Sequence, residues 1–512
     1  MKWWSDLWLK EGFATFSASV AANQVEPTWH TDRNSAIKYM MSVLNLDSFK
    51  SSHPVSVPLD NPKRITEIYD AISYYKGFTL IRMMTMFLGD DIFRNGIHNY
   101  LVKYSYKTTI QDDLWRELTN VNQKYGIFTR DVTVKEIMDT WTTQTGYPIL
   151  TVTRNYDDKS VSINQKRYFI LPSKSVSSST WWVPLTVLIE RDATRRDKSE
   201  EQPLQWLAAG EGLEQRHRFQ HGADVNECCV FSALCRVNYD KRNWQLLSYA
   251  LNSNKYEAIP VMARAQLVSD ALALAWTNEL DYFTALNLIS YLEREQDFLP
   301  LSTGKQALEM IDDILKRSPD YEVLQQFVCK LIEKTYKKSG GLAQKKIINA
   351  KNLNSVKMQV GRLLILLTKL FVSLSHWACN MKLPGCEENA IQLYERWMKT
   401  SNPDEHNPIP LDLRSTVYCV AASRGSVLHW RFALAREQRA NVPGVKTELR
   451  LALACSKDVW VLKQYLEMAV TEGSGVRRQD AVEVIRSILE NTVGYYFAKD
   501  FIYERIADIY KQ

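Results

Sequence analysis

The sequence predicts a multidomain, mainly α-helical protein in which a small antiparallel β-sandwich separates two helical regions. Three observations lead to this fold class. The 512 residues are enough for about three domains of roughly 150 residues each. Hydrophobic residues recur with a helical period up to about Gly146 and again beyond Asp240. Between these points, short alternating stretches are separated by turn residues, a pattern typical of a small antiparallel sandwich.

Residues 1–146 are predicted to be helical. In EIYDAISYYKGFTLIRMMTMFL, hydrophobic residues follow a helical spacing over residues 68–86. Gly89 is expected to end this helix, because a glycine accepts the backbone conformation that closes a helix. Thr109, followed three residues later by Asp112, is expected to cap the start of another helix.

Residues 147–240 form the predicted β-sandwich. Stretches such as ILTVTR, KSVSINQ and WWVPLTVLIE alternate in the manner of strands, and NYDDK is a turn signal. Residues 241–512 return to the helical period, in segments such as ARAQLVSDALALAW and AIQLYERWMK. Helices of about 10–20 residues joined by short polar turns predict antiparallel helix pairs and therefore an α-solenoid.

The charge and hydropathy patterns exclude several classes of protein. The net charge is +6 and the basic residues are scattered, which disfavours nucleic-acid binding because phosphate affinity needs clustered Lys and Arg. The longest apolar run, LLILLTKLFVSL, is interrupted by Lys369 and is too short to span a bilayer. No targeting signal is recognised at the start of the chain.

The eight cysteines leave two interpretations open. None of them forms a CxxC pair, so zinc-finger and thioredoxin-like sites are disfavoured. Their even number permits disulfides without requiring them, and buried free thiols remain the alternative.

Several segments, taken in order, carry a resemblance to a known family. They are WWSDLWLKEGFATF, DAISYYKG, LWRELTN, TWTTQTGYPILTV, CRVNYDKRNW, ARAQLVSDALALA, LRSTVYCVA, ALACSKDVWVLKQYL and RRQDAVEV. Together they resemble the aminopeptidase N family of gluzincin metallopeptidases, over essentially the whole chain. The resemblance implies the helical lobe of a thermolysin-like catalytic domain over 1–146, a β-sandwich over 147–240, and an α-solenoid like that of endoplasmic-reticulum aminopeptidases over 241–512.

The resemblance assigns a metal-binding role to Glu11. The family signature is HExxH followed by 18 residues and a glutamate in a WLxEGFA segment, and Glu11 of WLKEGFA occupies the position of this third zinc ligand. Without that context, Glu11 would be a solvated helix glutamate. The chain is expected to begin about nine residues after the second histidine, with both histidine ligands, the catalytic glutamate and the GxMEN loop upstream. It is also expected to lack the last C-terminal helices.

The remaining histidines do not replace the missing ligands. Only His217 and His221 have the i, i+4 spacing that places two imidazoles on one helical face. Arg218 stands where the family has a glutamate, and the segment lies in the strand-rich region. Surface histidines are therefore the preferred interpretation, and the one zinc ion expected in the intact protein is not expected to bind to this chain alone.

The resemblance also identifies a catalytic tyrosine. Tyr74 of AISYYKG matches the family tyrosine that donates a hydrogen bond to the oxyanion of the tetrahedral intermediate. A phenol suits this role because it is a neutral donor at pH 7. Tyr75 is the neighbouring alternative, and a structural tyrosine in the core is the alternative for either residue.

Disulfide pairing and location follow from the same resemblance. The family's ectodomain members have one short and one longer disulfide in the helical domain, which implies Cys379–Cys386 and Cys419–Cys455, with Cys329 unpaired. Disulfides imply an oxidising environment, so an extracellular or cell-surface location is expected. Membrane attachment would then depend on segments outside this chain. Peptides are the expected substrates, and a homodimer through the helical domain is the expected assembly.

The predicted function is therefore part of a zinc metalloaminopeptidase that releases N-terminal residues from peptides. As written, the chain is expected to be inactive, because HExxH and GxMEN are absent. The alternatives are a non-catalytic peptide-binding or receptor-like short form and a purely structural solenoid. Trp3, Trp4, Leu7 and Trp8 are expected to lack packing partners within the chain and to favour aggregation.

Overall fold

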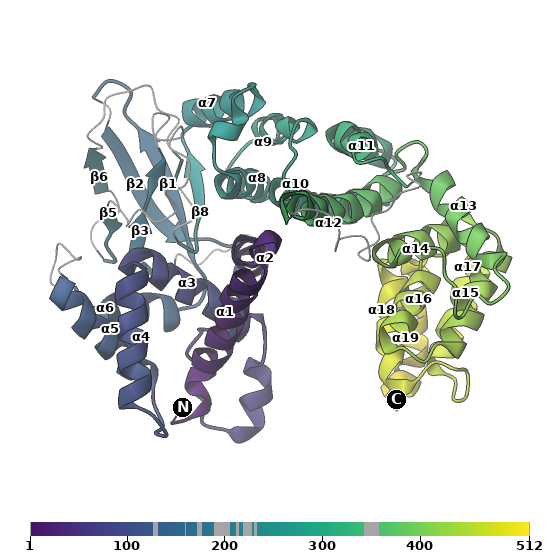
Figure 1. Ribbon diagram of the computed structural model, residues 1–512, viewed down its shortest axis with the longest axis horizontal. Coiled ribbons are helices and arrows are strands. Elements are labelled where there is room, and N and C mark those ends of the chain that lie inside the picture. Colours follow the sequence, from purple (N-terminus) through teal and green to yellow (C-terminus); the bar gives the residue numbers. More distant parts are fainter. Residues whose placement is uncertain are drawn as a thin grey trace. The chain divides into compact units, whose positions relative to one another are not determined.

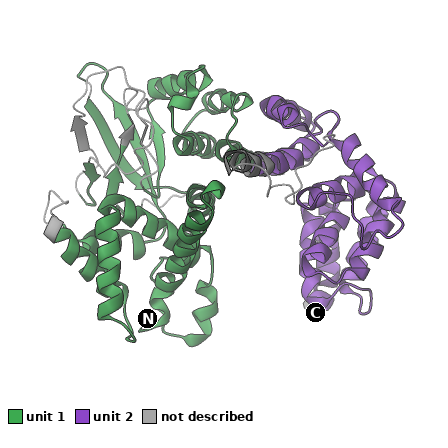
Figure 2. Cartoon of the chain, viewed as in Figure 1, with its two compact units in different colours: residues 1–308 green, residues 309–512 purple. Residues whose placement is uncertain are grey.

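The computed structural model divides the chain into two compact units, residues 1–308 (unit 1) and residues 309–512 (unit 2), as Figure 2 shows. The structure describes residues 2–125, 132–158, 160–171, 177–188, 205–210, 215–218, 228–229, 233–342 and 358–510. Within these ranges the protein is mainly helical, with strands confined to one region of unit 1. The predicted fold class is confirmed in these respects.

Unit 1 begins with a lobe of six α-helices. They are α1 (Leu7–Val25), α2 (Thr31–Leu46), α3 (Gly77–Leu88), α4 (Asp90–Lys103), α5 (Gln111–Tyr125) and α6 (Val134–Thr142). Gly89 ends α3 with a backbone φ of 78°, in agreement with its predicted role.

The prediction of a single helix over residues 68–86 is wrong for the first half of this segment. A 3₁₀ segment, η3 (Pro62–Ile68), is followed by a separate π-helical turn, η4 (Ile72–Lys76), and only then does α3 begin. The helical spacing of the hydrophobic residues extends across this break because η3, η4 and α3 all bury residues in the same lobe. The predicted start of α5 also shifts. The N–H of Ile110 donates to Asp113 (3.1 Å), and the hydroxyl of Thr109 pairs with that of Tyr100 (2.7 Å).

Among the described residues, eight strands follow the lobe: β1 (Pro148–Arg154), β2 (Ser160–Arg167), β3 (Val183–Leu185), β4 (Val187–Leu188), β5 (Gln205–Leu207), β6 (Gln215–Arg218), β7 (Cys228–Cys229) and β8 (Arg236–Tyr239). The largest sheet has the order β6-β2-β1-β8, and β3–β5 and β4–β7 form separate two-stranded pairs. Figure 1 shows β2, β1 and β8 side by side.

The expectation of a wholly antiparallel region needs one correction. β1 and β8 run parallel, with Leu150 opposite Val237, whereas the other pairs are antiparallel. A parallel pair needs a long connection. The segment from β1 to β8 provides one, because it contains strands β2 to β7. The alternation pattern gives strand positions but not strand directions.

Helices fill the rest of the described chain. They are α7 (Lys241–Asn252), α8 (Val261–Trp276), α9 (Tyr282–Ile289), α10 (Phe298–Leu315), α11 (Tyr321–Lys338), α12 (Met358–Asn380), α13 (Cys386–Met398), α14 (Arg414–Arg424), α15 (Val427–Arg439), α16 (Pro443–Leu453), α17 (Val459–Val470), α18 (Arg478–Glu490) and α19 (Tyr495–Tyr510). No strand follows Tyr239 in the part that the structure describes. The domain limits at residues 146 and 240 stay a prediction, because the compact units divide elsewhere.

Unit 2 contains the two disulfides found among the described residues. They join Cys379 to Cys386, with a Cα separation of 5.1 Å, and Cys419 to Cys455, with a Cα separation of 5.3 Å. These are the pairs that the family resemblance implied. Cys329 is a free thiol, also as expected.

The expectation for the aromatic start of the chain is wrong for Trp4, Leu7 and Trp8. Trp4 packs against the cluster around Leu7, and its ring centroid lies 6.2 Å from that of Tyr69. Leu7 and Trp8 are fully buried within the lobe, while Trp3 is 45% exposed. Leu7 packs with Leu59 and Ile68. The lobe therefore supplies its own partners for most of this stretch.

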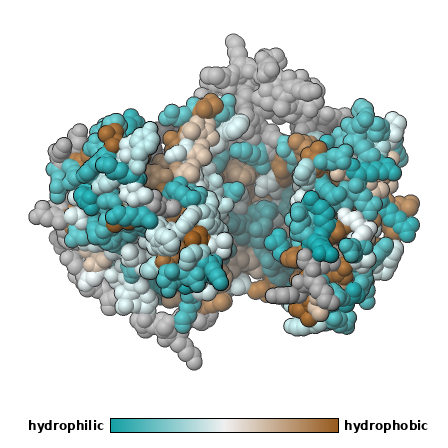
Figure 3. Space-filling model, turned by 90° about the horizontal axis from the view of Figure 1, so that it is seen from below, coloured by the Kyte–Doolittle hydropathy of each residue, from teal (hydrophilic) through white to brown (hydrophobic). Residues whose placement is uncertain are grey.

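No helix in the described ranges is long and apolar enough to cross a membrane. In the view of Figure 3, hydrophobic residues lie in small scattered groups among hydrophilic ones over the described surface.

Candidate active site

Helix α1 holds Glu11 one turn beyond a fully buried anchor. The indole of Trp8 stacks on that of Trp115, with ring centroids 5.9 Å apart, and its N–H donates to Gln111 (3.3 Å). Residues three positions apart lie on the same side of a helix, so the buried Trp8 fixes the direction of the Glu11 side chain. Glu11 itself is 16% exposed, which leaves its carboxylate accessible at the edge of the lobe.

A close contact between two glycines places Glu11 beside the π-helical turn η4. A Cβ atom on Gly12 would lie 2.9 Å from the carbonyl carbon of Gly77, and one on Gly77 would lie 3.1 Å from the Cα of Gly12. Only glycine at both positions allows the two backbones to approach so closely. Gly12 follows Glu11 directly and Gly77 follows η4, so this contact brings the two candidate site segments together.

Tyr74 lies in the middle of η4, which is capped at its start by Asp70. One carboxylate oxygen of Asp70 accepts the N–H groups of Ile72 (3.0 Å) and Ser73 (3.2 Å), and its carbonyl oxygen accepts the N–H of Tyr74 (3.2 Å). Isolated π-helical turns are rare and frequently occur at functional sites. The helical periodicity of the sequence gave no indication of this turn.

The Glu11 carboxylate is close enough to Tyr74 to influence the protonation of the phenol. The pKa of the Tyr74 phenol is raised, first by desolvation and then by its hydrogen bond to Glu11 and the negative charge there. Tyr74 therefore remains a neutral hydrogen-bond donor at pH 7. The structure thus brings together the two residues that the sequence placed 63 positions apart.

Lys10 adds a positive charge to the same group. Its ammonium lies 3.1 Å from a Glu11 oxygen, and the hydrogen bond to Glu11 is the main cause of the raised pKa of Lys10. The ammonium also lies over two aromatic rings, 5.4 Å from the centroid of Trp4 and 5.7 Å from that of Tyr69. Half of the Lys10 side chain is exposed, so this cation is able to move away from Glu11 at little cost.

Tyr75 has a different environment. Its ring stacks on that of Tyr39 from α2, with centroids 4.5 Å apart and an interplanar angle of 14°. Adjacent residues of a helical turn point in different directions, which separates Tyr75 from the Glu11–Tyr74 pair.

Sequence reasoning missed the residues that support the turn. His53 contacts Asp70 through Nε2 (2.9 Å) and the carbonyl of Pro54 through Nδ1 (2.7 Å). Lys76, the last residue of η4, forms a buried ion pair with Asp47 (2.6 Å). The only sequence signal was the position of Asp70 before a helical segment, since asparagine and aspartate are common caps.

The described residues do not complete a metal site by themselves. They contain no group of three His, Cys, Asp or Glu side chains that could hold a metal ion. His217 lies in β6, and His221 lies outside the described residues. Glu11 supplies an oxygen ligand of a type that zinc accepts, but one carboxylate does not make a zinc site.

The lobe, the β-strand region and the helical region in this order, with a glycine-packed Glu11 and a phenol beside it, define the class of M1 peptidases. The model of the peptidase family M1 domain matches residues 1–141, and that of the ERAP1-like C-terminal domain matches residues 232–512. The chain therefore belongs to the aminopeptidase N family of M1 metallopeptidases.

Known relatives cover the chain almost completely. It is 31% identical to aminopeptidase N of Homo sapiens over 510 residues and 32% identical to that of Bos taurus over 512 residues, in both cases over 98% of this chain and 50% of the relative. It is 30% identical to the thyrotropin-releasing hormone-degrading ectoenzyme of Rattus norvegicus, over 98% of this chain and 46% of that protein. The chain thus spans about half the length of the curated relatives it matches.

Proposed function

We propose that the protein containing this chain is a zinc metalloaminopeptidase that releases N-terminal residues from peptides, with Glu11 as a zinc ligand and Tyr74 as the donor to the transition state. The observation that carries the proposal is the close Gly12–Gly77 contact, which brings Glu11 beside the turn that carries Tyr74, where the Glu11 carboxylate helps to raise the pKa of the phenol. Family membership supports the assignment, because M1 aminopeptidases are zinc enzymes in general.

The chemistry of Tyr74 follows from its protonation. Because the pKa of the phenol is raised, the proton is retained at neutral pH and is available for a hydrogen bond. When a peptide carbonyl is attacked, negative charge develops on its oxygen, and a neutral donor already in place stabilises that charge. During the reaction the phenol would donate its hydrogen bond to the substrate oxygen.

The 512 residues alone should be inactive. Their sequence contains neither HExxH nor GxMEN, so two zinc ligands and the general base are missing from it. A positioned base alone typically contributes about 10²–10⁴-fold to the rate. We therefore expect this chain by itself to bind zinc no better than a surface carboxylate and to leave a leucyl chromogenic substrate intact. Cleavage by the isolated chain would contradict the assignment.

The proposed location follows from the disulfides and the relatives. Two disulfides in unit 2 favour an oxidising compartment, and one relative is named as an ectoenzyme, so we place the protein outside the cell or at its surface. Peptides are the proposed substrates. Association of two copies through the helical region stays a prediction from the resemblance.

Three variants of the full-length protein that contains these residues test the proposal. Glu11→Ala should lose bound zinc, because a two-histidine site holds the metal weakly. Tyr74→Phe should keep zinc and a similar KM while kcat falls by roughly 10²–10³-fold. Tyr75→Phe is the matched control, since it removes the neighbouring hydroxyl, and its kcat should stay close to that of the wild type.

Metal content, kcat and KM are measured for all three. An unchanged kcat in Tyr74→Phe would exclude the oxyanion role. Full metal content in Glu11→Ala would exclude the ligand role. A protein without any peptidase activity, but with affinity for peptides, would support the receptor-like alternative.

A further inference from the structure

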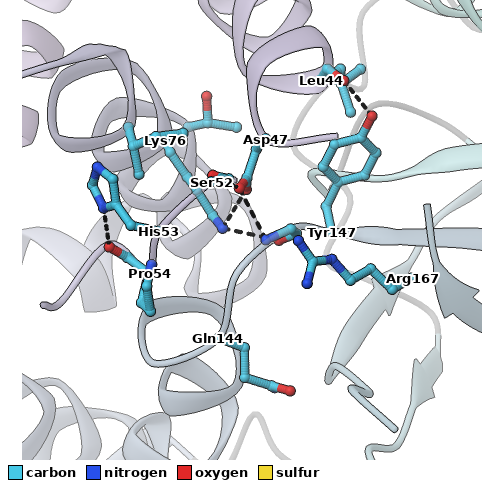
Figure 4. A network of polar contacts seen from close by, with 12 residues as sticks. Leu44, Asp47, Ser52, His53, Pro54, Lys76, Gln144, Tyr147 and Arg167 are labelled. Atoms are coloured by element: carbon cyan, nitrogen blue, oxygen red, sulfur yellow. Dashed lines mark hydrogen bonds and ion pairs between the residues drawn. The ribbon is translucent and has the colours of Figure 1, made fainter. Parts of the chain in front are cut away.

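The turn that carries Tyr74 ends in a fully buried charge network (Figure 4). The side chains of Lys76 and Asp47 are both 0% exposed, and the Lys76 ammonium donates to Asp47 (2.6 Å) and to the carbonyl oxygen of Gly146 (2.9 Å). The second carboxylate oxygen of Asp47 accepts the N–H of Gly146 (3.0 Å) and the hydroxyl of Ser52 (2.5 Å).

This network connects three distant segments of unit 1. Asp47 is the residue after α2, Lys76 is the last residue of η4, and Gly146 lies two residues before the start of β1. Gly146 has a positive φ of 83°. Its N–H and its C=O are bonded to Asp47 and to Lys76, so the pair also takes up the backbone polar groups of the chain entering the strand region.

Packing alone does not account for a lysine here. Removing an ammonium and a carboxylate from water carries a large desolvation penalty, and apolar residues of similar volume often give equal or higher stability. What the ion pair provides and apolar residues do not is directional bonding to Gly146. The charge therefore fixes the position of η4 relative to β1.

That position matters for Tyr74. Two residues separated by one position lie on nearly opposite sides of a helical turn, so an anchored Lys76 on the inner side directs Tyr74 outward, toward Glu11. Asp70 holds the start of the same turn, and Lys76 holds its end. A π-helical turn is rare compared with an α-helix, and this one is fixed by side chains at both of its ends.

We propose that Lys76, through its buried ion pair with Asp47 and its bond to Gly146, is a positioning residue that holds the Tyr74 phenol against Glu11. The catalytic consequence rests on the function proposed above, whereas the effect on the turn does not. Lys76 touches no reacting group; it acts through the backbone of η4.

Amide hydrogen exchange in the full-length protein tests the effect on the turn. In Lys76→Met the amides of residues 72–77 should exchange at least ten times faster than in the wild type. Arg264→Met is the matched control, because Arg264 forms another buried pair of unit 1 with Glu295 (2.8 Å). It should leave exchange in residues 72–77 within about twofold of wild type. Equal acceleration in both variants would overturn the proposal, because the effect would then be general loss of stability.

Kinetics test the catalytic consequence. Lys76→Met should lower kcat by about tenfold or more with KM within threefold, whereas Arg264→Met, corrected for folded fraction, should keep kcat within twofold. A Lys76→Met enzyme with wild-type kcat would overturn the positioning role. If Tyr74→Phe leaves kcat unchanged, the proposed function fails, and the exchange experiment still decides whether Lys76 holds the turn.

Should Lys76→Met not fold, Asp47→Asn provides the same test. Asparagine has nearly the volume of aspartate, and it removes the charge that binds Lys76. The same acceleration of exchange in residues 72–77, with a parallel fall in kcat, supports the proposal. Unchanged exchange and kcat overturn it.

Discussion

The contacts inside the two compact units differ in range. In unit 1, side-chain hydrogen bonds join residues far apart in the sequence, such as Trp8 and Gln111, 103 residues apart, or Asp47 and Gly146, 99 apart. In unit 2, helices pack mainly on the next helix or the next but one, and a bond such as that from Arg450 to Glu483 joins residues 33 apart.

The two units also differ in their covalent links. Both disulfides lie in unit 2 and close loops of 7 and 36 residues, whereas no described side chain of unit 1 forms one. The comparison shows that the candidate site depends on the unit with the longer-range contacts. Four experiments test this difference between the units.

The largest effect is expected from Trp8→Ala. This fully buried indole packs on Trp115 and bonds Gln111, so its removal should destabilise unit 1 by about 3–5 kcal/mol. Trp460→Ala in unit 2 is the control: this indole is 49% exposed, and the loss should stay below about 1 kcal/mol. Denaturant unfolding followed by hydrogen exchange in each unit measures both. Similar losses would mean that the two units depend on buried aromatic contacts to the same degree.

Removal of the longer disulfide comes next. The double variant Cys419→Ser/Cys455→Ser should lose about 2–4 kcal/mol in unit 2, and Cys379→Ser/Cys386→Ser should lose about 1.5 kcal/mol less, because stabilisation grows with the logarithm of loop length. Cys329→Ser, which alters a free thiol, is the control. A loss in unit 1, or a larger loss for the shorter loop, would contradict the prediction.

The third prediction compares the substitution of one glycine in each unit by alanine. Gly12→Ala places a Cβ 2.9 Å from backbone of Gly77, so α1 must shift, with a loss of about 1–3 kcal/mol and of activity in the intact enzyme. Gly444 in α16 has no atom within 4 Å of such a Cβ, and Gly444→Ala should raise stability by about 0.4–1 kcal/mol. Thermal unfolding distinguishes the two. An unperturbed Gly12→Ala protein would show that the close contact is not needed.

The smallest effect concerns the pH dependence of the Asp70 cap. The hydrogen bond to Asp70 raises the pKa of His53, with the carbonyl of Pro54 and the charge of Asp47 adding to the effect. Partial burial raises the pKa of Asp70, but the bonds from His53 and the N–H of Ser73 lower it overall.

The stability that this pair contributes therefore depends on pH. The contribution of His53 is complete below its unfolded pKa of about 6.5 and is lost as the pH rises through its higher folded value. The contribution of Asp70 is complete above about 3.9 and is lost as the pH falls through its lower folded value. Since both groups are partly exposed, the loss above about pH 6.5 should be roughly 0.5–1 kcal/mol. Unfolding of wild type and His53→Gln between pH 6 and 8 measures it; identical slopes would contradict the prediction.

The sequence predicted the parts of the fold that depend on local pattern. ARAQLVSDALALAW became α8, and AIQLYERWMK lies in α13, because a helix needs only its own period and a partner surface. The break between Ile68 and Ile72 was not predicted, since it depends on hydrogen bonds of the Asp70 carboxylate that hydrophobic spacing does not reveal. The parallel pairing of β1 and β8 was missed for a similar reason: alternation carries no strand direction.

The candidate site was likewise predicted only in part. Glu11 and Tyr74 were predicted because each lies in a motif that resembles the family. The close approach of their two segments, and the bonds among Lys76, Asp47 and Gly146, depend on three-dimensional assembly that no local window contains.

The bond between Lys76 and Gly146 also affects when the lobe can complete its folding during synthesis. These residues are 70 positions apart, and at about 5–20 residues per second the chain takes roughly 4–14 s to be synthesised from one to the other. Glu11 and Tyr74 leave the ribosome first, yet η4 cannot be anchored until Gly146 arrives. During biosynthesis the lobe therefore passes through a stage in which both site residues exist but the phenol has no fixed place beside the carboxylate.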